Sequence, residues 1–227
     1  MTSTAILIPA RFKSSRFPGK PLTDLGGIPM IKRVYEACAK TGYDTYVLTD
    51  DWSIAQLFND NNCRVENADY KNGTERCSGA IPLLRRYERF INVQGDMPDV
   101  TSDCIEGCLD LLGFYHVSTV YTKMPKELQN DPNSVKLIRY ENRALWFGRG
   151  FKGYGDWHLG VYGYTREILA KYWSYVKYPE ENIEQLEQLR WIKNGVQIGV
   201  NEVEWSGIEI NTPEDAEKWN GRNSNSH

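Results

Sequence analysis

Residues 5–22 read AILIPARFKSSRFPGKPL, an apolar run followed at once by a basic loop. The run Ala5–Pro9 has the length and composition of a buried strand. The loop after it is rich in Gly, Pro and Ser, and its net charge is four minus one, or +3 (Arg11, Lys13, Arg16 and Lys20 against Asp24). Small residues let a backbone approach phosphate oxygens, and Arg and Lys offset the charge of a triphosphate. The stretch therefore predicts a strand that opens into a phosphate-binding loop, although a solvated basic loop fits the spacing equally well.

Helix and strand patterns alternate along the rest of the chain. Helices are predicted at 28–40, 53–59, 74–86, 101–112, 179–193 and 213–220. Strands are predicted at 45–49, 90–93, 118–122, 135–140, 144–147, 159–164 and 197–203. This order indicates right-handed β-α-β units, and so a Rossmann-like α/β three-layer sandwich with a mixed, mainly parallel sheet. We expect one domain over residues 1–220 and a frayed polar tail at 221–227.

The composition excludes several classes of protein. Hydrophobic residues make up 41% of the 227 residues and charged residues 25%, so neither a disordered chain nor a fibrous repeat is indicated. A net charge of −3 argues against general nucleic-acid binding, and the apolar run near the start is too short to cross a bilayer. We therefore expect a cytoplasmic protein with no membrane partner. Five cysteines without CxxC spacing, and only three histidines, favour reduced packing residues over a zinc site.

The tripeptide Gln94-Gly95-Asp96 directly follows the strand predicted at 90–93. In a doubly wound sheet, ligands bind beyond the carboxyl ends of the strands. Gly95 permits a sharp turn there, and Asp96 presents a hard oxygen suited to magnesium. A turn or N-cap aspartate is the commoner use of such a residue.

Two further loops precede predicted helices. In the first, Gly73 stands where free backbone amides can face a base or a phosphate, while Thr74 can equally be an N-cap. In the second, residues 212–215 form a capping box, which leaves Asn211 as a candidate oxygen ligand for a metal at Asp96 or as a plain surface residue. The basic loop after the first predicted strand contains neither GxxxxGK[ST] nor GxGxxG.

Taken in order, these motifs are far more specific than any one of them. The set comprises Ile8–Leu22, Gly73-Thr74-Glu75-Arg76-Cys77, Asn92-Val93-Gln94-Gly95-Asp96, Ala144-Leu145-Trp146-Phe147, His158–Tyr164, Glu187-Gln188-Leu189-Arg190 and Thr212-Pro213-Glu214-Asp215. In this set the chain resembles, over essentially its whole length, the CMP-KDO synthetase family of 3-deoxy-manno-octulosonate cytidylyltransferases. The resemblance implies a nucleotidyltransferase-type fold and a homodimer. It also implies magnesium-dependent transfer of a cytidylyl group from CTP to a 2-keto-3-deoxy sugar acid, a step of lipopolysaccharide biosynthesis.

The resemblance also implies roles for individual residues. The residues implied to bind the nucleotide are Ala10, Arg11, Ser14, Arg16, Lys20, Gly73, Thr74, Arg76 and Gln94. Those implied to be catalytic are Arg11, Arg16, Lys20 and Asp96, and Asp96 and Asn211 are implied to hold Mg²⁺. Those implied to bind the sugar are Arg149, His158, Tyr162, Glu187 and Gln188. The nucleotide part would cover about residues 1–115, and the sugar-binding and dimerisation part about 116–220.

Three positions depart from the family pattern. Asn211 stands where the family has an aspartate, and since an amide oxygen carries no charge, we expect a raised magnesium requirement. Tyr70-Lys71-Asn72 replaces a His-x-Ser, so contacts to the base can differ. Only eight residues separate Arg149 from His158, whereas the family carries a longer loop there. The shorter loop can open the pocket to another sugar acid, such as an amino-substituted octulosonate, and it can weaken dimerisation.

Two alternatives remain open. A CMP-sialic acid synthetase would perform the same chemistry on another sugar acid. A non-catalytic nucleotide-binding relative would keep the fold and lose activity, although the presence of Arg11, Arg16, Lys20 and Asp96 speaks against it. A glycosyltransferase would usually display Asp-x-Asp, which Gln94-Gly95-Asp96 is not.

Overall fold

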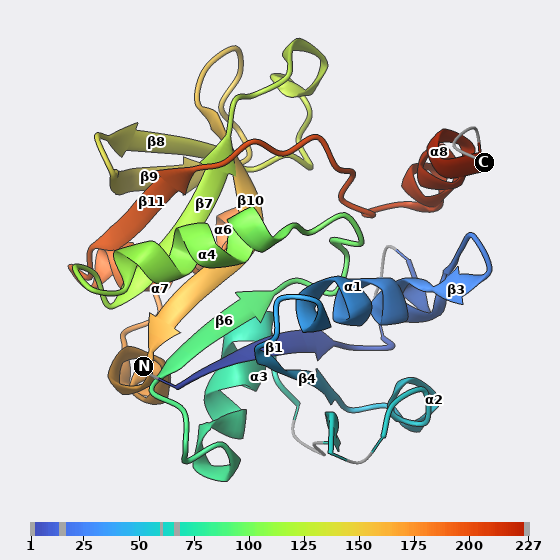
Figure 1. Ribbon diagram of the computed structural model, residues 1–227. Coiled ribbons are helices and arrows are strands. Elements are labelled where there is room, and N and C mark those ends of the chain that lie inside the picture. Colours follow the sequence, from blue (N-terminus) through green and yellow to red (C-terminus); the bar gives the residue numbers. More distant parts are fainter. Residues whose placement is uncertain (1–2, 14–16, 60, 66–68, 225–227) are drawn as a thin grey trace.

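The computed structural model describes residues 3–13, 17–59, 61–65 and 69–224 (Figure 1). The strands are β1 (Thr4–Ala10), β2 (Asp24–Leu25), β3 (Ile28–Pro29), β4 (Asp44–Thr49), β5 (Cys63–Val65), β6 (Arg89–Val93), β7 (Val117–Thr122), β8 (Lys136–Tyr140), β9 (Arg143–Gly148), β10 (Asp156–Thr165) and β11 (Ile198–Glu202). The helices are α1 (Met30–Ala39), α2 (Trp52–Ala55), α3 (Gly73–Ala80), α4 (Ser102–Leu111), α5 (Arg166–Ala170), α6 (Pro179–Glu184), α7 (Leu189–Lys193) and α8 (Pro213–Ser224). Short 3₁₀ turns are η1 (Lys20–Leu22), η2 (Ile81–Leu83), η3 (Lys126–Leu128) and η4 (Tyr172–Ser174).

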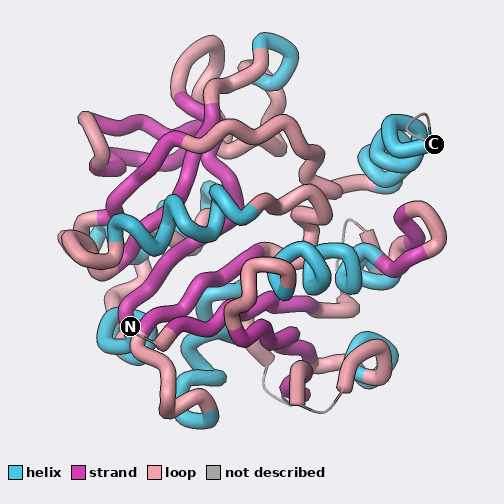
Figure 2. Tube along the Cα trace, viewed as in Figure 1, coloured by secondary structure: helices cyan, strands magenta, loops and turns pink. Residues whose placement is uncertain are grey.

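Nine of the described strands form one sheet in the order β5-β4-β1-β6-β10-β7-β11-β9-β8, while β2 and β3 form a separate hairpin. Strands β5, β4, β1 and β6 are parallel, as the alternation of helices and strands predicts. Strand β10 runs antiparallel to both β6 and β7, and it therefore joins the parallel half to the mixed second half. The predicted mixed sheet, whose strands are magenta in Figure 2, is confirmed, and its parallel pairing is concentrated in the first half.

Helices cover both faces of this sheet and make the predicted three-layer sandwich, which is confirmed. Side chains alternate along a strand, so Ile6 and Ile8 face one core while Ala5 and Leu7 face the other. Helices α1 and α4 cover the first core, and α3, α5 and α7 cover the second. Helix α8 lies apart from the sheet, beside the β2–β3 hairpin (Figure 1).

Several predicted boundaries were wrong, including those of the helices predicted at 28–40 and 53–59, which are Met30–Ala39 and Trp52–Ala55. The helix predicted at 179–193 is two helices, because Gln185 adopts a left-handed conformation (φ 55°) that ends α6. The helix predicted at 74–86 begins one residue earlier, at Gly73, and gives way to η2 after Ala80. The tail predicted from 221 is helical through Ser224, and residues 225–227 lie outside the described ones.

All five cysteines are buried, which supports their prediction as packing residues. Cys104 and Cys108 lie one turn apart on the face of α4 that packs on the sheet. Within the described chain, no helix has both the length and the apolar character needed to cross a membrane.

Candidate active site

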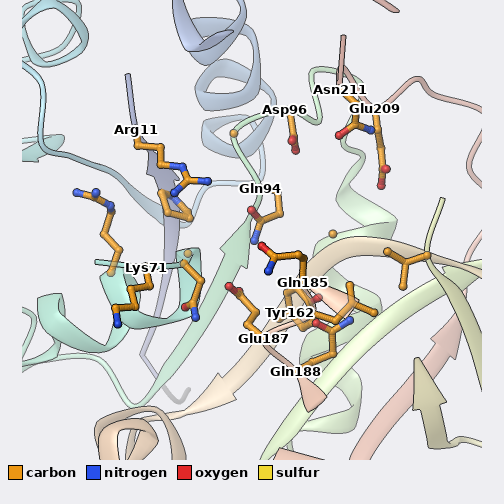
Figure 3. Close-up of a pocket in the computed structure, with 18 of the residues that line it drawn as sticks. Arg11, Lys71, Gln94, Asp96, Tyr162, Gln185, Glu187, Gln188, Glu209 and Asn211 are labelled. Carbon is orange, nitrogen blue, oxygen red and sulfur yellow. The ribbon is translucent and has the colours of Figure 1, made fainter. Parts of the chain in front are cut away.

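A pocket of about 860 Å³ opens at the carboxyl ends of β1 and β6, where a doubly wound sheet is expected to bind its ligands (Figure 3). Because β10 runs antiparallel to β6, the first half of β10 lies at this same edge. The Gln94 backbone N–H donates to the Gly160 carbonyl at 3.1 Å. The pocket is thus shared by the two halves of the chain.

Most of the residues proposed from the sequence line this pocket. They are Ala10, Arg11, Lys20, Gly73, Arg76, Gln94, Asp96, Arg149, His158, Tyr162, Glu187, Gln188 and Asn211. Thr74 is fully buried behind the pocket wall. Ser14 and Arg16 lie outside the described residues, so their roles stay predictions.

The basic loop after β1 is closed by its own backbone. The Gly19 N–H donates to the Phe12 carbonyl at 3.1 Å, and Gly19 has a φ of 71°, a left-handed conformation that glycine adopts without strain. The turn η1 then begins at Lys20, whose Nζ lies 2.7 Å from Asp96 Oδ2. Both side chains are partly buried, so the loop places an ammonium beside the carboxylate of Asp96 in the loop that follows β6.

Glycines at this edge allow the loops to come close together. A Cβ on Gly95 would lie 3.1 Å from the Pro9 carbonyl oxygen, and a Cβ on Gly160 would lie 2.8 Å from Cγ of Gln94. Gly95 has no positive φ, so its role is this close approach rather than the special turn conformation expected from the sequence. The tight packing fixes Gln94 between the two halves of the pocket.

The start of α3 joins the predicted nucleotide and sugar sites. Asn72, not Thr74, is the N-cap, because its Oδ1 accepts the Glu75 N–H at 2.8 Å. The Thr74 N–H and hydroxyl both donate to Glu187 Oε1, at 3.1 and 2.6 Å. Burial raises the pKa of Glu187, while these hydrogen bonds act in the opposite direction. Glu187 is therefore hydrogen-bonded to the nucleotide side of the pocket.

Two buried donors at the pocket are left free for a ligand. Arg76 donates from Nη2 to Asp50 at 3.1 Å and lies over the Tyr70 ring, but its Nη1 has no acceptor among the described residues. Gln188 is 1% exposed, and its Nε2 likewise lacks an acceptor in the described part of the chain. An unsatisfied buried donor is costly, so both positions favour a bound polar group.

Alternation along β10 points His158, Gly160 and Tyr162 into the pocket and Leu159 and Val161 into the core. His158 Nε2 lies 3.0 Å from the Thr119 hydroxyl, and the ring packs against Phe147. Burial and then the charge of Arg149 lower the pKa of His158 from 6.5 to about 3. His158 is thus a neutral hydrogen-bonding group at neutral pH.

This low pKa predicts an acid-sensitive fold. Between pH 6.5 and about 3 the unfolded chain binds a proton at His158 that the folded chain does not, so stability falls as the pH falls. From pH 7 to pH 5 this loss should be about 2 kcal/mol. Urea unfolding of a His158→Asn variant at both pH values should show a pH dependence smaller by that amount. Changing the exposed His116 to Asn should leave the pH dependence of the free energy of unfolding unaltered. If His158→Asn also left it unaltered, the imidazole of His158 would be protonated at pH 5 in the folded chain.

Sequence reasoning missed several pocket residues, chief among them Lys71, Glu184, Gln185 and Glu209. Glu184 holds the Arg149 backbone, accepting its N–H at 2.9 Å. Burial and then the negative charge of Asp96 raise the pKa of Glu209 to about 8. The signal for Glu209 was present in the sequence, because it stands two residues before Asn211 in an alternating Ile208-Glu209-Ile210-Asn211 stretch.

The donors around Asp96 are of the kind that magnesium prefers. Asp96, Glu209 and Asn211 offer carboxylate and amide oxygens at one end of the pocket (Figure 3). Across the described residues, no three His, Cys, Asp or Glu side chains are close enough to hold a metal by themselves. This fits magnesium, which usually takes one or two carboxylates and completes its shell with water and substrate phosphates.

Comparison with known proteins identifies the family. The pattern of the cytidylyltransferase family matches residues 5–198. The chain belongs to this family. Among its relatives, an 8-amino-3,8-dideoxy-manno-octulosonate cytidylyltransferase of Shewanella halifaxensis is 38% identical over 94% of this chain and 95% of its own length. A 3-deoxy-manno-octulosonate cytidylyltransferase of Parabacteroides distasonis is 34% identical over 93% of this chain and 94% of its own length.

Solved structures agree with this assignment. A CMP:2-keto-3-deoxy-manno-octonic acid synthetase complexed with CTP superposes with a TM-score of 0.90, at 30% identity over 100% of both chains. A glucose-1-phosphate thymidylyltransferase-like protein of Bacillus anthracis reaches a TM-score of 0.71 at 13% identity over 97% of this chain and 95% of its own, which shows the shared fold alone. The resemblance of this cytidylyltransferase to the CMP-KDO synthetase family is confirmed.

Proposed function

We propose that this cytidylyltransferase transfers the cytidylyl group of CTP to 3-deoxy-manno-octulosonate or its 8-amino analogue, in a magnesium-dependent reaction that releases diphosphate. The observation that carries the proposal is the shared pocket. It brings Lys20 and Asp96, from the loops after β1 and β6, to the same cavity as His158 and Tyr162 of β10. The relatives with these activities are matched along almost their whole length.

In the proposed reaction, the anomeric 2-hydroxyl of the sugar acid attacks the α-phosphorus of CTP in line, and diphosphate departs. No covalent intermediate on the protein is needed, since such transfers depend mainly on positioning and electrostatic stabilisation. Arg11 and Lys20 offset the charge of the phosphates and of the departing diphosphate. Arg76 and Gln94 orient the nucleotide, with the free Nη1 of Arg76 as a donor.

The acceptor site is proposed at the other side of Gln94. Arg149 supplies a positive charge for the sugar carboxylate, and neutral His158 and Tyr162 supply hydrogen bonds to hydroxyl groups. The free Nε2 of buried Gln188 is a further donor. Bound magnesium would neutralise phosphate oxygens and orient the acceptor, held by Asp96 and its neighbouring oxygen donors.

Diphosphate release tests this proposal. The protein, CTP and Mg²⁺ are incubated with 3-deoxy-manno-octulosonate, its 8-amino analogue and a sialic acid in turn. Release with either octulosonate supports the proposal, whereas release with sialic acid alone would favour a CMP-sialic acid synthetase. CTP binding without release from any acceptor would favour the non-catalytic relative.

A change at Asn211 should alter the magnesium requirement of the reaction. Changing Asn211 to Asp adds a charge beside Asp96, so the Mg²⁺ concentration that gives half-maximal rate should fall by several-fold, because charged oxygens bind this cation more tightly than neutral ones. Rates measured across a Mg²⁺ series check the effect. An unchanged or higher requirement would remove Asn211 from the metal site.

The division of the chain, its oligomeric state and its compartment are also proposals. We propose a nucleotide-binding part over about residues 1–115, a sugar-binding part over about 116–220, a homodimer, and action in the cytoplasm. The connection between β9 and β10 is short and holds Gly153 and Gly155 in left-handed conformations. A short connection supports the expectation of a more open sugar site and a weaker dimer.

A further inference from the structure

The segment before α8 presents alternate side chains to two different environments. Ile210 is fully buried in a small cluster with Leu25 and Trp219, and Ile208 packs against the same cluster. Glu209 and Asn211 line the pocket. Alternate side chains of an extended segment point in opposite directions, so the apolar anchors fix Glu209 and Asn211 toward the same cavity.

A backbone contact holds this segment beside Asp96. The Ile210 N–H donates to the Asp96 carbonyl at 2.9 Å, so the residues on either side of Ile210 flank Asp96. Figure 3 shows Asp96, Glu209 and Asn211 grouped together, with Gln94 between this group and Arg11.

We propose that Glu209 is a magnesium ligand that acts with Asp96 and supplies the negative charge that Asn211 lacks. The inference rests on the proposed magnesium-dependent function. The family pattern has its second carboxylate at position 211. In this chain Glu209, two residues earlier on the same face of the segment, would supply that carboxylate. The site then keeps two carboxylates for a divalent cation, and Asn211 contributes at most a neutral oxygen.

Charge balance supports this assignment. Lys20, at 2.7 Å from Asp96, offsets a single negative charge. Two carboxylates that face one cavity repel each other, and a divalent cation between them turns this repulsion into attraction. Glu209 is half-buried at the pocket wall, so solvent only partly screens the attraction between its carboxylate and a divalent cation.

Binding of Mn²⁺, as a spectroscopic substitute for Mg²⁺, tests the inference without any turnover. Free Mn²⁺ is measured by electron paramagnetic resonance during titration of the protein saturated with a CTP analogue whose α,β-bridge is a methylene group. The change Glu209→Gln keeps the side-chain shape and removes the charge, so it should raise the Mn²⁺ dissociation constant about tenfold or more. Glu204→Gln, an exposed position in the same segment, should leave the constant unchanged.

A rescue variant separates a lost ligand from a damaged fold. In the Glu209→Gln background, Asn211→Asp returns one carboxylate to the same face and should restore Mn²⁺ affinity to within about threefold of the parent protein. An unchanged Mn²⁺ affinity in Glu209→Gln overturns the inference. If that variant instead shifts only the preference between octulosonate and its amino analogue, Glu209 contacts the acceptor, and the inference also fails. If the unaltered protein binds no Mn²⁺ in the presence of the nucleotide analogue, the proposed metal dependence itself fails.

Discussion

Changing Asp96 to Asn should lower kcat/KM for diphosphate release by about a hundred- to a thousand-fold. Asp96 lies in the loop after β6 at the pocket edge, and its Oδ2 lies 2.7 Å from Lys20 Nζ. Asparagine keeps the size of the side chain but removes the charge that holds this ammonium and that a bound cation would need. Loss of one such electrostatic contact to a reacting centre typically costs about 2.7–4 kcal/mol of transition-state stabilisation.

The loss should be in turnover and not in folding. The two side chains are 19% and 25% exposed, and an ion pair so close to solvent typically contributes about 1 kcal/mol or less to stability. Urea unfolding of Asp96→Asn should therefore stay near that of the parent, and Asp110→Asn, at an exposed position of α4, should change neither property. A loss of kcat/KM smaller than tenfold would mean that Asp96 only shapes the loop.

The first half of the fold could be predicted because its signals are local. The Ala5–Pro9 run and the apolar spacing in 28–40 each reflect a strand or helix that covers most of the predicted position. The break at Gln185 could not be predicted in this way. It depends on a left-handed backbone conformation at Gln185, a residue type with no local preference for it.

The residues of the candidate site also differ in whether a local sequence pattern could predict them. The loops after β1 and β6 follow from the order of strands, so Lys20 and Asp96 could be placed near each other from the sequence. The bond between Thr74 and Glu187 joins positions 113 residues apart, and no local pattern indicates it. Glu209 is a third case, because the alternation was visible but the direction of its face depends on the hydrogen bond from Ile210 to Asp96.

Changing Arg190 to Met should destabilise the fold by about 3–5 kcal/mol. Arg190 is 3% exposed and donates to both oxygens of Glu181, at 2.8 and 2.6 Å, and to Glu75 at 3.1 Å. Its guanidinium also lies 4.0 Å from the centre of the Tyr172 ring. Methionine would leave two buried carboxylates without their shared cation, and breaking a buried ion pair from one side has a cost of this size. The free energy of unfolding in urea measures it.

The same change should also disturb the pocket, because Glu75 belongs to α3 and Glu181 to α6, so Arg190 ties the helix at the nucleotide side to the segment that carries Glu187. Arg190→Lys keeps the charge but cannot reach both carboxylates with a planar fork, so its loss of stability should be intermediate. Lys171→Met removes an exposed pair with Glu167 and should leave the free energy of unfolding nearly unchanged. A loss of stability in Arg190→Met no larger than in this surface control would mean that Lys177 or solvating water stabilises the two carboxylates without Arg190. Arg190 would then not be the link between the two sides of the pocket.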